Sequence, residues 1–289
     1  MEADWTDSEA PWWAKLRRAY RHIEEVRARV TQLDDSGWSV EREPGEAPSE
    51  TTYRLRVHRP IPADLTTAVG DAVHNMRSSL DCVTYALARR HLGRDLTEKE
   101  EEQTKFPIRK SRLEFDAYFK HEVRGAMFGQ HERAGMCSVK PFAFSEEATS
   151  HGVVPNNSPD EDYRFDVLHR LHVLSNIDKH RRLPLLAWSP EMTYWTEQHS
   201  PARYRWRPAP FVPYEDGAVL GVLFDPQGGG APDATVFHEI RLLLMDDLAP
   251  HSSMTDTLIG WHRSLTSWVL PRVFIVASGQ PAPMLIVTG

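Results

Sequence analysis

The stretch DLTTAVGDAVHNMRSSLDCVTYALARR, residues 64–90, decides the fold because it is the best-defined helical pattern in this chain of 289 residues. Its apolar residues recur every three or four positions, at Leu65, Val69, Val73, Met76, Leu80, Val83 and Leu87. Asp64 suits the N-cap of a helix, and Gly93 follows as a stop signal. The pattern therefore predicts an amphipathic helix over residues 64–90 whose apolar face packs into a core.

Two further helical patterns accompany this one. Residues 161–182 carry apolar side chains at helical spacing and end before Pro184, which cannot continue a helix. Residues 11–33 repeat the pattern and begin at Pro11, which suits a first helical position. We expect the three helices to form the core of the protein.

Strand patterns precede the helix over residues 64–90 and follow the helix over residues 161–182. Residues 38–42 and 52–58 flank a turn that contains Pro, Gly and Ser, and they predict an N-terminal hairpin. After residue 182, short strand-like runs separated by Pro and Gly predict an antiparallel sheet. These runs are residues 183–188, 192–199, 202–207, 218–224 and 234–244.

The remaining segments predict smaller elements. Short helices are expected at residues 97–103 and 111–120, and an internal loop at 121–160. A closing helix over 255–270 and an edge strand over 284–287 complete the chain. The fold class that follows is α+β, with a mainly helical core over residues 1–182 and an antiparallel β region with a closing helix over 183–289. We expect the two parts to pack as one unit.

Composition limits the classes of function. A formal net charge of −7 argues against a protein that coats nucleic acid through general electrostatics, although a local basic patch remains compatible with it. The acidic start of the chain lacks the pattern of a secretory signal, and no run approaches the length of a membrane-spanning helix. Cys82 and Cys137 form no CxxC pair, which argues against a disulfide framework and a thiolate zinc site. We expect a cytoplasmic protein that does not enter a membrane.

Polar side chains follow one line along each of two helices. His74, Arg77 and Asp81 stand at i, i+3 and i+7 and flank the apolar face of the first helix. On the helix over 161–182, the corresponding line is His169, His172, Asn176 and His180. Because a charged group at the margin of an apolar face needs a partner, the two lines are expected to meet. They form either a buried polar network that fixes the packing of the helices or a functional site.

Four segments resemble a widespread bacterial family of uncharacterised proteins. The segments are GDAVHNMRSSLDCVTYALA at 70–88, FPI at 106–108, VKPF at 139–142 and LHRLHVLSNIDKHRRL at 168–183. The family has an HNxRSxLD helix and an NIDKHR helix in the same order, and the resemblance covers about residues 11–190. It identifies the chain as a member of that family and implies no activity by itself.

A remoter resemblance is to HEPN domains, the helical domains of RNA-cleaving toxins and antiviral defence proteins. Their signature places His about five positions after Arg, often with Asn after the Arg. Here Arg77 is followed at that distance by Cys82, and the second helix has Asn176 and His180 with Ser175 in place of the Arg. The resemblance implies RNA as a partner and a homodimer. It also implies a metal-independent ribonuclease, in which His is the acid or base and Arg stabilises the phosphorane charge.

The candidate catalytic residues are therefore Arg77, His180, Asn176, Asp81 and His74, with no cofactor. The departures at Cys82 and Ser175 favour a catalytically degenerate descendant that serves as a binding module. The alternative is a small-molecule enzyme that uses acid–base chemistry or a divalent transition metal. In that enzyme the metal ligands would be His74, Asp81, His172 and His180, because imidazole and carboxylate groups bind such ions. The chain contains no HExxH or facial-triad motif to support this alternative.

Overall fold

The computed structural model describes residues 7–140, 142–143, 167–180, 185–188, 192–194, 204–209, 212–226, 234–236, 239–242 and 253–281. Contacts within the chain define two compact units whose sequences alternate. The first, here called the helical unit, comprises Met1–His22, Gly70–Arg181 and Leu258–Gly289. The second, the sheet unit, comprises Ile23–Val69 and Arg182–Thr257. The fold class is α+β, as predicted.

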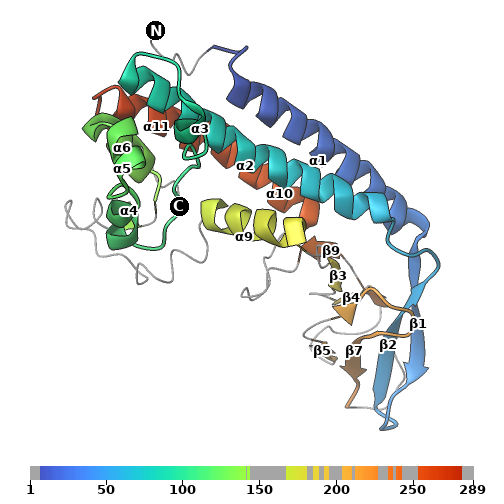
Figure 1. Cartoon of the computed structure of the whole chain (residues 1–289). Helices are drawn as coiled ribbons and strands as arrows, with labels where there is room; N and C mark the ends of the chain where they lie inside the picture. Colours follow the sequence, from blue (N-terminus) through green and yellow to red (C-terminus); the bar gives the residue numbers. More distant parts are fainter. Residues whose placement is uncertain are drawn as a thin grey trace. The chain divides into compact units, whose positions relative to one another are not determined.

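The three long helices are confirmed (Figure 1). α1 covers Pro11–Ser36, α2 covers Ala63–Leu92, and α9 covers Val167–His180, whereas residues 161–166 lie outside the described part of the chain. Every residue of the predicted apolar stripe on α2 is at most 1% exposed. The helix therefore forms for the predicted reason, which is burial of one apolar face. Among the described residues, no helix is long and apolar enough to cross a membrane.

The closing helix is longer than predicted. It begins as α10 (Met254–Ser264), passes through the π-helical turn η2 (Leu265–Val269) and continues as α11 (Leu270–Ala277). The sequence pattern ended this helix before Pro271, since proline lacks an N–H and clashes with the preceding turn. A π-helical turn immediately before Pro271 widens the helix and lets it continue, which is why the predicted end was wrong.

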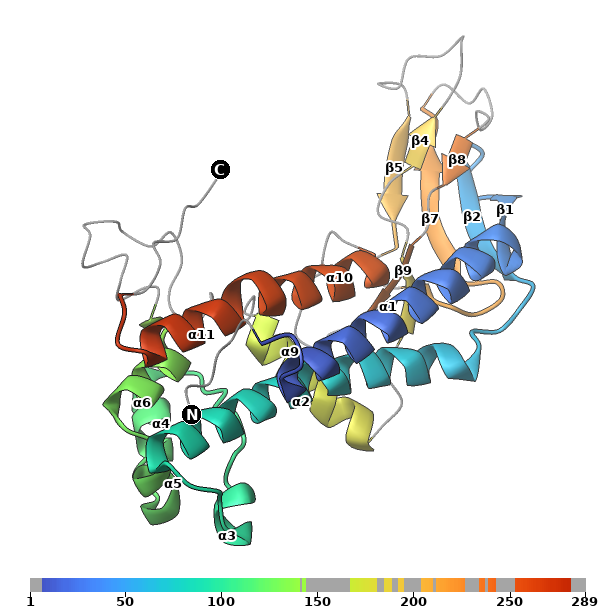
Figure 2. The same ribbon diagram turned by 90° about the horizontal axis from the view of Figure 1, so that it is seen from above.

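Within the helical unit, the closing helix lies antiparallel to the start of α1 (Figure 2). The rings of Trp12 and Phe274 are 5.1 Å apart, and His262 Nε2 lies 3.1 Å from the carbonyl oxygen of Leu16. Burial lowers the pKa of His262, and the hydrogen bond to Leu16 opposes this effect. These contacts fix the first turns of α1 beside the closing helix.

Short helices occupy part of the predicted loop. α3 (Glu98–Glu101) and α4 (Arg112–Tyr118) match the short helices predicted in that region. However, α5 (Glu122–Met127) and α6 (Gln130–Cys137) lie within residues 121–160, for which a loop was predicted. Helices of six and eight residues are too short for a hydrophobic period to stand out. Packing supplies the stability that their sequences do not show.

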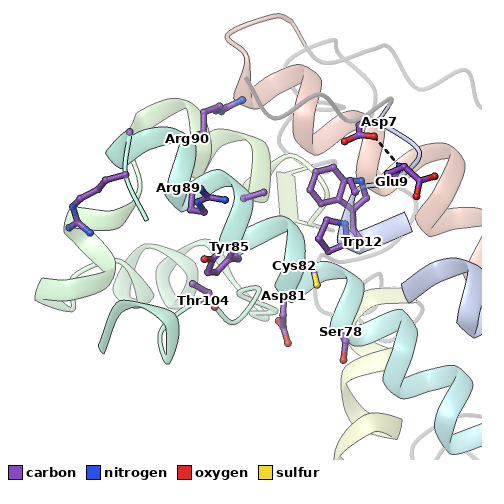
Figure 3. A pocket seen from close by; sticks show the side chains of 15 residues that line it. Asp7, Glu9, Trp12, Ser78, Asp81, Cys82, Tyr85, Arg89, Arg90 and Thr104 are labelled. Carbon is purple, nitrogen blue, oxygen red and sulfur yellow. Dashed lines mark hydrogen bonds between the residues drawn. The ribbon is translucent and has the colours of Figure 1, made fainter. Parts of the chain in front are cut away.

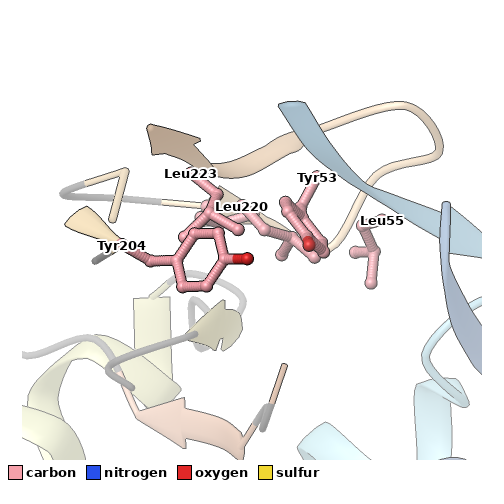
Figure 4. Packing of buried hydrophobic residues seen from close by; sticks show 6 residues of the cluster. Tyr53, Leu55, Tyr204, Leu220 and Leu223 are labelled. Carbon is pink, nitrogen blue, oxygen red and sulfur yellow. The ribbon is translucent and has the colours of Figure 1, made fainter. Parts of the chain in front are cut away.

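The hairpin and the later strands form one sheet in the sheet unit. Its antiparallel strands have the order β1 (Trp38–Pro44), β2 (Glu50–Val57), β7 (Val219–Phe224) and β5 (Arg205–Pro208). The core cluster of buried residues in this region comprises Tyr53, Leu55, Tyr204, Val212, Leu220 and Leu223 (Figure 4). The predicted hairpin is confirmed, but its second strand, β2, pairs with β7, which lies more than 160 residues later in the sequence.

Two smaller antiparallel sheets accompany it. One has the strand order β6 (Val212–Pro213), β3 (Leu185–Trp188), β9 (Glu239–Leu242), and the other pairs β4 (Met192–Tyr194) with β8 (Ala234–Val236). The strand-like runs after residue 182 are thus distributed over three sheets instead of one. The predicted edge strand at residues 284–287 lies outside the described residues.

Gly221 in β7 lies close to Trp206 and to the backbone of Arg207. A Cβ atom at this position would lie 2.3 Å from the Trp206 ring and 2.7 Å from the carbonyl oxygen of Arg207. We expect Gly221→Ala to lower the free energy of unfolding by about 1.5 kcal/mol, because Trp206 also packs edge-on against Tyr53. Urea denaturation would measure this change. Gly260→Ala is the control, because nothing lies within 4 Å of that position and alanine favours a helix there by up to about 1 kcal/mol.

Candidate functional site

Two residues of the predicted polar line on α2, Arg77 and Asp81, bind the backbone of Phe106, and this arrangement is here called the clamp. Arg77 Nη1 donates to Asp81 Oδ1 at 2.5 Å, and Arg77 Nη2 donates to the carbonyl oxygen of Phe106 at 3.1 Å. The Phe106 N–H donates to the same Asp81 oxygen at 2.8 Å. Arg77 and Asp81 therefore bind both backbone groups of one residue, and the Arg77 side chain is only 11% exposed. His74 is exposed, and its Nε2 lies 3.3 Å from the Ser78 hydroxyl.

The segments that carry the family resemblance converge on Phe106. Its backbone is bound by the α2 pair, and its ring lies 4.3 Å from the Nζ of fully buried Lys140. Phe106 belongs to the FPI segment and Lys140 to the VKPF segment, so three of the four quoted segments meet at one residue. A buried cation on an aromatic ring stabilises this arrangement.

The fourth segment approaches through His172. This residue of α9 lines the same cavity as Arg77, and its Nε2 lies 3.2 Å from Asn176 Nδ2. Asn176 itself is exposed. The side chain of His180 lies outside the described residues, so its predicted approach to Arg77 remains a prediction. The two polar lines therefore share a cavity through Arg77 and His172.

This cavity, here called the basic cavity, has a volume of about 260 Å³. Its cationic lining residues are Arg77, Lys105, Arg109 and Arg124, and its carboxylate is Glu102. The remaining lining residues are Gln103, Phe106, Ile108, Tyr118 and His172. Because Asp81 already neutralises Arg77, the other three cations give the cavity its positive charge. This charge is local and coexists with the negative charge of the whole chain.

Tyr118 orders two of these arginines. The guanidinium carbon of Arg124 lies 4.1 Å from the centre of the Tyr118 ring, and that of Arg109 lies 5.0 Å from it. The Tyr118 hydroxyl donates to the carbonyl oxygen of Lys105 at 2.8 Å. Burial raises the pKa of Tyr118, and the nearby Arg124 and Arg109 oppose that shift. The phenol therefore stays neutral and serves as a rigid platform for both guanidinium groups.

The cationic side chains of the basic cavity can bind an anion. Within the described part of the chain, Lys105, Arg109 and Arg124 form no ion pair with a carboxylate. Hydrogen bonds from ammonium and guanidinium groups to an anionic oxygen are charge-assisted, so these cations favour an anion in the cavity. The cavity is therefore suited to bind an anion beside an aromatic ring.

A second cavity of about 850 Å³ lies along another part of α2 (Figure 3). Ser78, Asp81 and Cys82 line it together with the start of α1. Cys82, which replaces the histidine of the HEPN signature, lines this larger cavity and not the basic cavity. Burial raises the pKa of the Cys82 thiol, so it is a poor acid or base for chemistry at Arg77.

The predicted metal set does not assemble among the residues that are described. No three His, Cys, Asp or Glu side chains in this part of the chain come together as a metal site. Asp81 is held by Arg77 and Phe106, and His74 lies beside Ser78 at the surface. His74, Asp81 and His172 alone thus do not form a metal site, and the alternative that includes His180 stays a prediction because the side chain of His180 lies outside the described residues.

Most residues of the basic cavity could not be predicted from the sequence. Lys105, Arg109, Tyr118 and Arg124 come from three separate segments, and none has the spacing of a known motif. One signal was present, because the FPI segment stands within the basic run KFPIRK at residues 105–110. Basic residues on both sides of an apolar anchor place cations around the buried Phe106.

No family model, no curated protein and no solved structure matches the chain. The bacterial family and the HEPN resemblance thus continue to rest on the quoted motifs. The geometry of the helical unit provides the separate physical basis for a function. That geometry suits an anionic group in the basic cavity.

Proposed function

We propose that this protein is a HEPN-like RNA-binding module of defence or toxin type, and that it is catalytically degenerate. The observation that carries the proposal is the basic cavity, where Arg109 and Arg124 lie against the Tyr118 ring. Guanidinium groups held in place by an aromatic ring can pair with a phosphate and stack on a base, and both contacts are common in single-strand recognition. The resemblance to HEPN domains agrees with RNA as the partner.

The size of the basic cavity favours a single nucleotide unit over a whole small molecule. A volume of about 260 Å³ is below the range of roughly 300–1,000 Å³ of drug-sized sites. A phosphate and part of its nucleotide fit such a space, while the rest of a strand follows the surface. The exposed side chain of Lys105 at the rim can bind the next phosphate.

Binding is favoured over cleavage because the groups needed for chemistry are engaged or replaced. Arg77 is held by Asp81 and the carbonyl oxygen of Phe106, which limits its approach to a phosphorane. Cys82 stands where the HEPN signature has histidine, and burial raises its pKa. A site of this kind retains RNA affinity without a positioned acid or base.

The test is binding of a fluorescein-labelled single-stranded RNA of about twelve nucleotides, followed by anisotropy. We expect the double variant Arg109→Ala/Arg124→Ala to bind at least about tenfold more weakly. Two lost phosphate contacts should also reduce the slope of log K against log salt by about 1.4. Arg27→Ala/Arg263→Ala is the matched control, because it removes two exposed arginines that do not line the cavity. Equal losses in both double variants would show that only total charge matters and would contradict the proposed site.

The same RNA distinguishes binding from cleavage. We expect the strand to remain intact on a denaturing gel after incubation with the wild-type protein. Cleavage without added metal that is lost in Arg77→Lys, under conditions in which a thermal melt shows this variant to be folded, would instead support the ribonuclease and overturn the degenerate assignment. A homodimer, which the HEPN resemblance implies, is tested in the same samples by light scattering.

A further inference from the structure

The larger cavity of the helical unit has one long wall, formed by a single face of α2 (Figure 3). Ser78, Cys82, Tyr85 and Arg89 follow one another at three- or four-residue spacing along this face. At 1.5 Å per residue, the wall from Ser78 to Arg89 is about 16 Å long. The first turn of α1, including Trp12, forms the opposite wall. A volume of about 850 Å³ accommodates a whole small molecule.

The centre of this cavity is aromatic and apolar. Trp12, Cys82, Tyr85 and Ala86 line it, and Trp12 is only 5% exposed. The indole N–H of Trp12 is buried and has no hydrogen-bond partner. This N–H has almost no accessible surface, so an occupant of the cavity meets the indole ring and not its donor.

The two ends of the cavity differ in charge. Asp7 and Glu9 lie near Trp12 at one end, and arginines from the last turns of α2 lie at the other (Figure 3). A negative group on an occupant is therefore disfavoured beside Trp12 and favoured at the arginine end.

Arg89 is the arginine available to an occupant. Arg90 is already bound to Glu132 and to the carbonyl oxygen of Ala277, and Arg94 makes two hydrogen bonds to Glu100. Arg89 pairs with Asp95 at 2.5 Å, but the two side chains are 43% and 81% exposed. Exposed pairs of this kind contribute little, so Arg89 can exchange its partner.

We propose that this cavity binds a small aromatic molecule that carries an anionic group at one end. The ring body lies between Trp12 and the Cys82–Tyr85–Ala86 wall, and the anionic group pairs with Arg89. This site is separate from the basic cavity, so it stands whether or not RNA binds there.

Two fluorescent probes that differ by one charge test the proposal. 1-Anilinonaphthalene-8-sulfonate and N-phenyl-1-naphthylamine share the same rings, but only the first carries a sulfonate. We expect saturable binding of both at one site, with the sulfonate bound more tightly. Arg89→Ala should weaken binding of the sulfonate about fivefold and leave the neutral probe unchanged. Equal losses for the two probes, or none for either, would remove Arg89 from the site.

A filled cavity provides the second test. Ala86→Trp places a large ring in the cavity, and we expect it to weaken both probes by about tenfold or more. Ala117→Trp is the control, since Ala117 is exposed on α4 and lines neither cavity. Thermal melts of both variants confirm that each is folded. Wild-type affinity in folded Ala86→Trp would overturn the proposal.

Cys82 gives a readout in the unmodified protein. It lines the cavity and is partly accessible, whereas Cys137 is buried. Saturating 1-anilinonaphthalene-8-sulfonate should slow alkylation of Cys82 by iodoacetamide at least about fivefold at about pH 9, as followed by mass spectrometry. The same rate of alkylation with and without the bound probe would place the probe elsewhere and contradict the site.

Discussion

Arg77→Ala should lower the free energy of unfolding by about 3 kcal/mol, which is a large share of the stability of an ordinary domain. The Arg77 side chain is 11% exposed and donates to both Asp81 and the carbonyl oxygen of Phe106. Its removal leaves the Asp81 carboxylate without its ion pair and the Phe106 carbonyl without this donor. Urea denaturation at neutral pH measures the change.

Two further variants separate this clamp from a general effect of charge. Arg77→Lys should lose most of the same stability, because one ammonium group cannot reach both acceptors with the geometry of a guanidinium. Arg109→Ala removes a cation of the same cavity that stacks on Tyr118, and we expect it to cost no more than about 1 kcal/mol. If Arg77→Ala and Arg109→Ala lower the free energy of unfolding by equally small amounts, the clamp does not stabilise the fold.

Glu132→Gln should lower the free energy of unfolding by about 2.5 kcal/mol at pH 7. Glu132 is buried in α6 and accepts a hydrogen bond from Arg90 of α2 at 2.8 Å. Its other oxygen accepts the N–H of Gly129 at 3.1 Å, and Arg90 also binds the carbonyl oxygen of Ala277 in α11. One carboxylate thus connects the end of α2 to α6 and, through Arg90, to α11.

The loss of stability caused by Glu132→Gln should become smaller as the pH falls. Burial would raise the pKa of Glu132, but the Arg90 hydrogen bond and the local backbone outweigh it, so the pKa lies below its ordinary value of 4.5. A carboxylate with a lowered pKa in the folded state stabilises the fold fully above the unfolded pKa. That contribution is lost as the pH falls through the folded pKa.

The quantity to measure is the difference in the free energy of unfolding between wild type and Glu132→Gln, from pH 7 down to acid pH. We expect the full difference at pH 7 and a progressive decrease as the pH falls below about 4.5. Glu98→Gln, at an exposed position of α3, should change stability by less than about 0.5 kcal/mol at either pH. A difference that stays constant down to acid pH would show that the charge of Glu132 is not the source of the stability.

The helices could be predicted wherever the apolar period extends over many turns. The stripe from Leu65 to Leu87 is buried as expected, and α1 and α9 follow the same rule. The prediction was wrong where local sequence was too short to show a period, as in α5 and α6. It was also wrong at Pro271, where a π-helical turn resolves a local conflict that the sequence alone cannot show.

The candidate site was predicted in part. Arg77 and His172 do share a cavity, and Arg77 pairs with Asp81, as the spacing of one helical turn indicates. The three residues that give this cavity its free charge, Lys105, Arg109 and Arg124, were not predicted. Their positions depend on how the segment after α3 and the start of α5 fold over α2.

The sequence by itself determined the helix over residues 64–90, because a hydrophobic period is a local property of the chain. It also determined that a line of polar residues flanks the apolar face of that helix. Only the tertiary structure decided what those residues do. Asp81 and Arg77 bind the backbone of Phe106, which lies 25 and 29 positions further along the chain. Backbone groups are the same at every residue, so no sequence pattern indicates which N–H and carbonyl a side chain will bind.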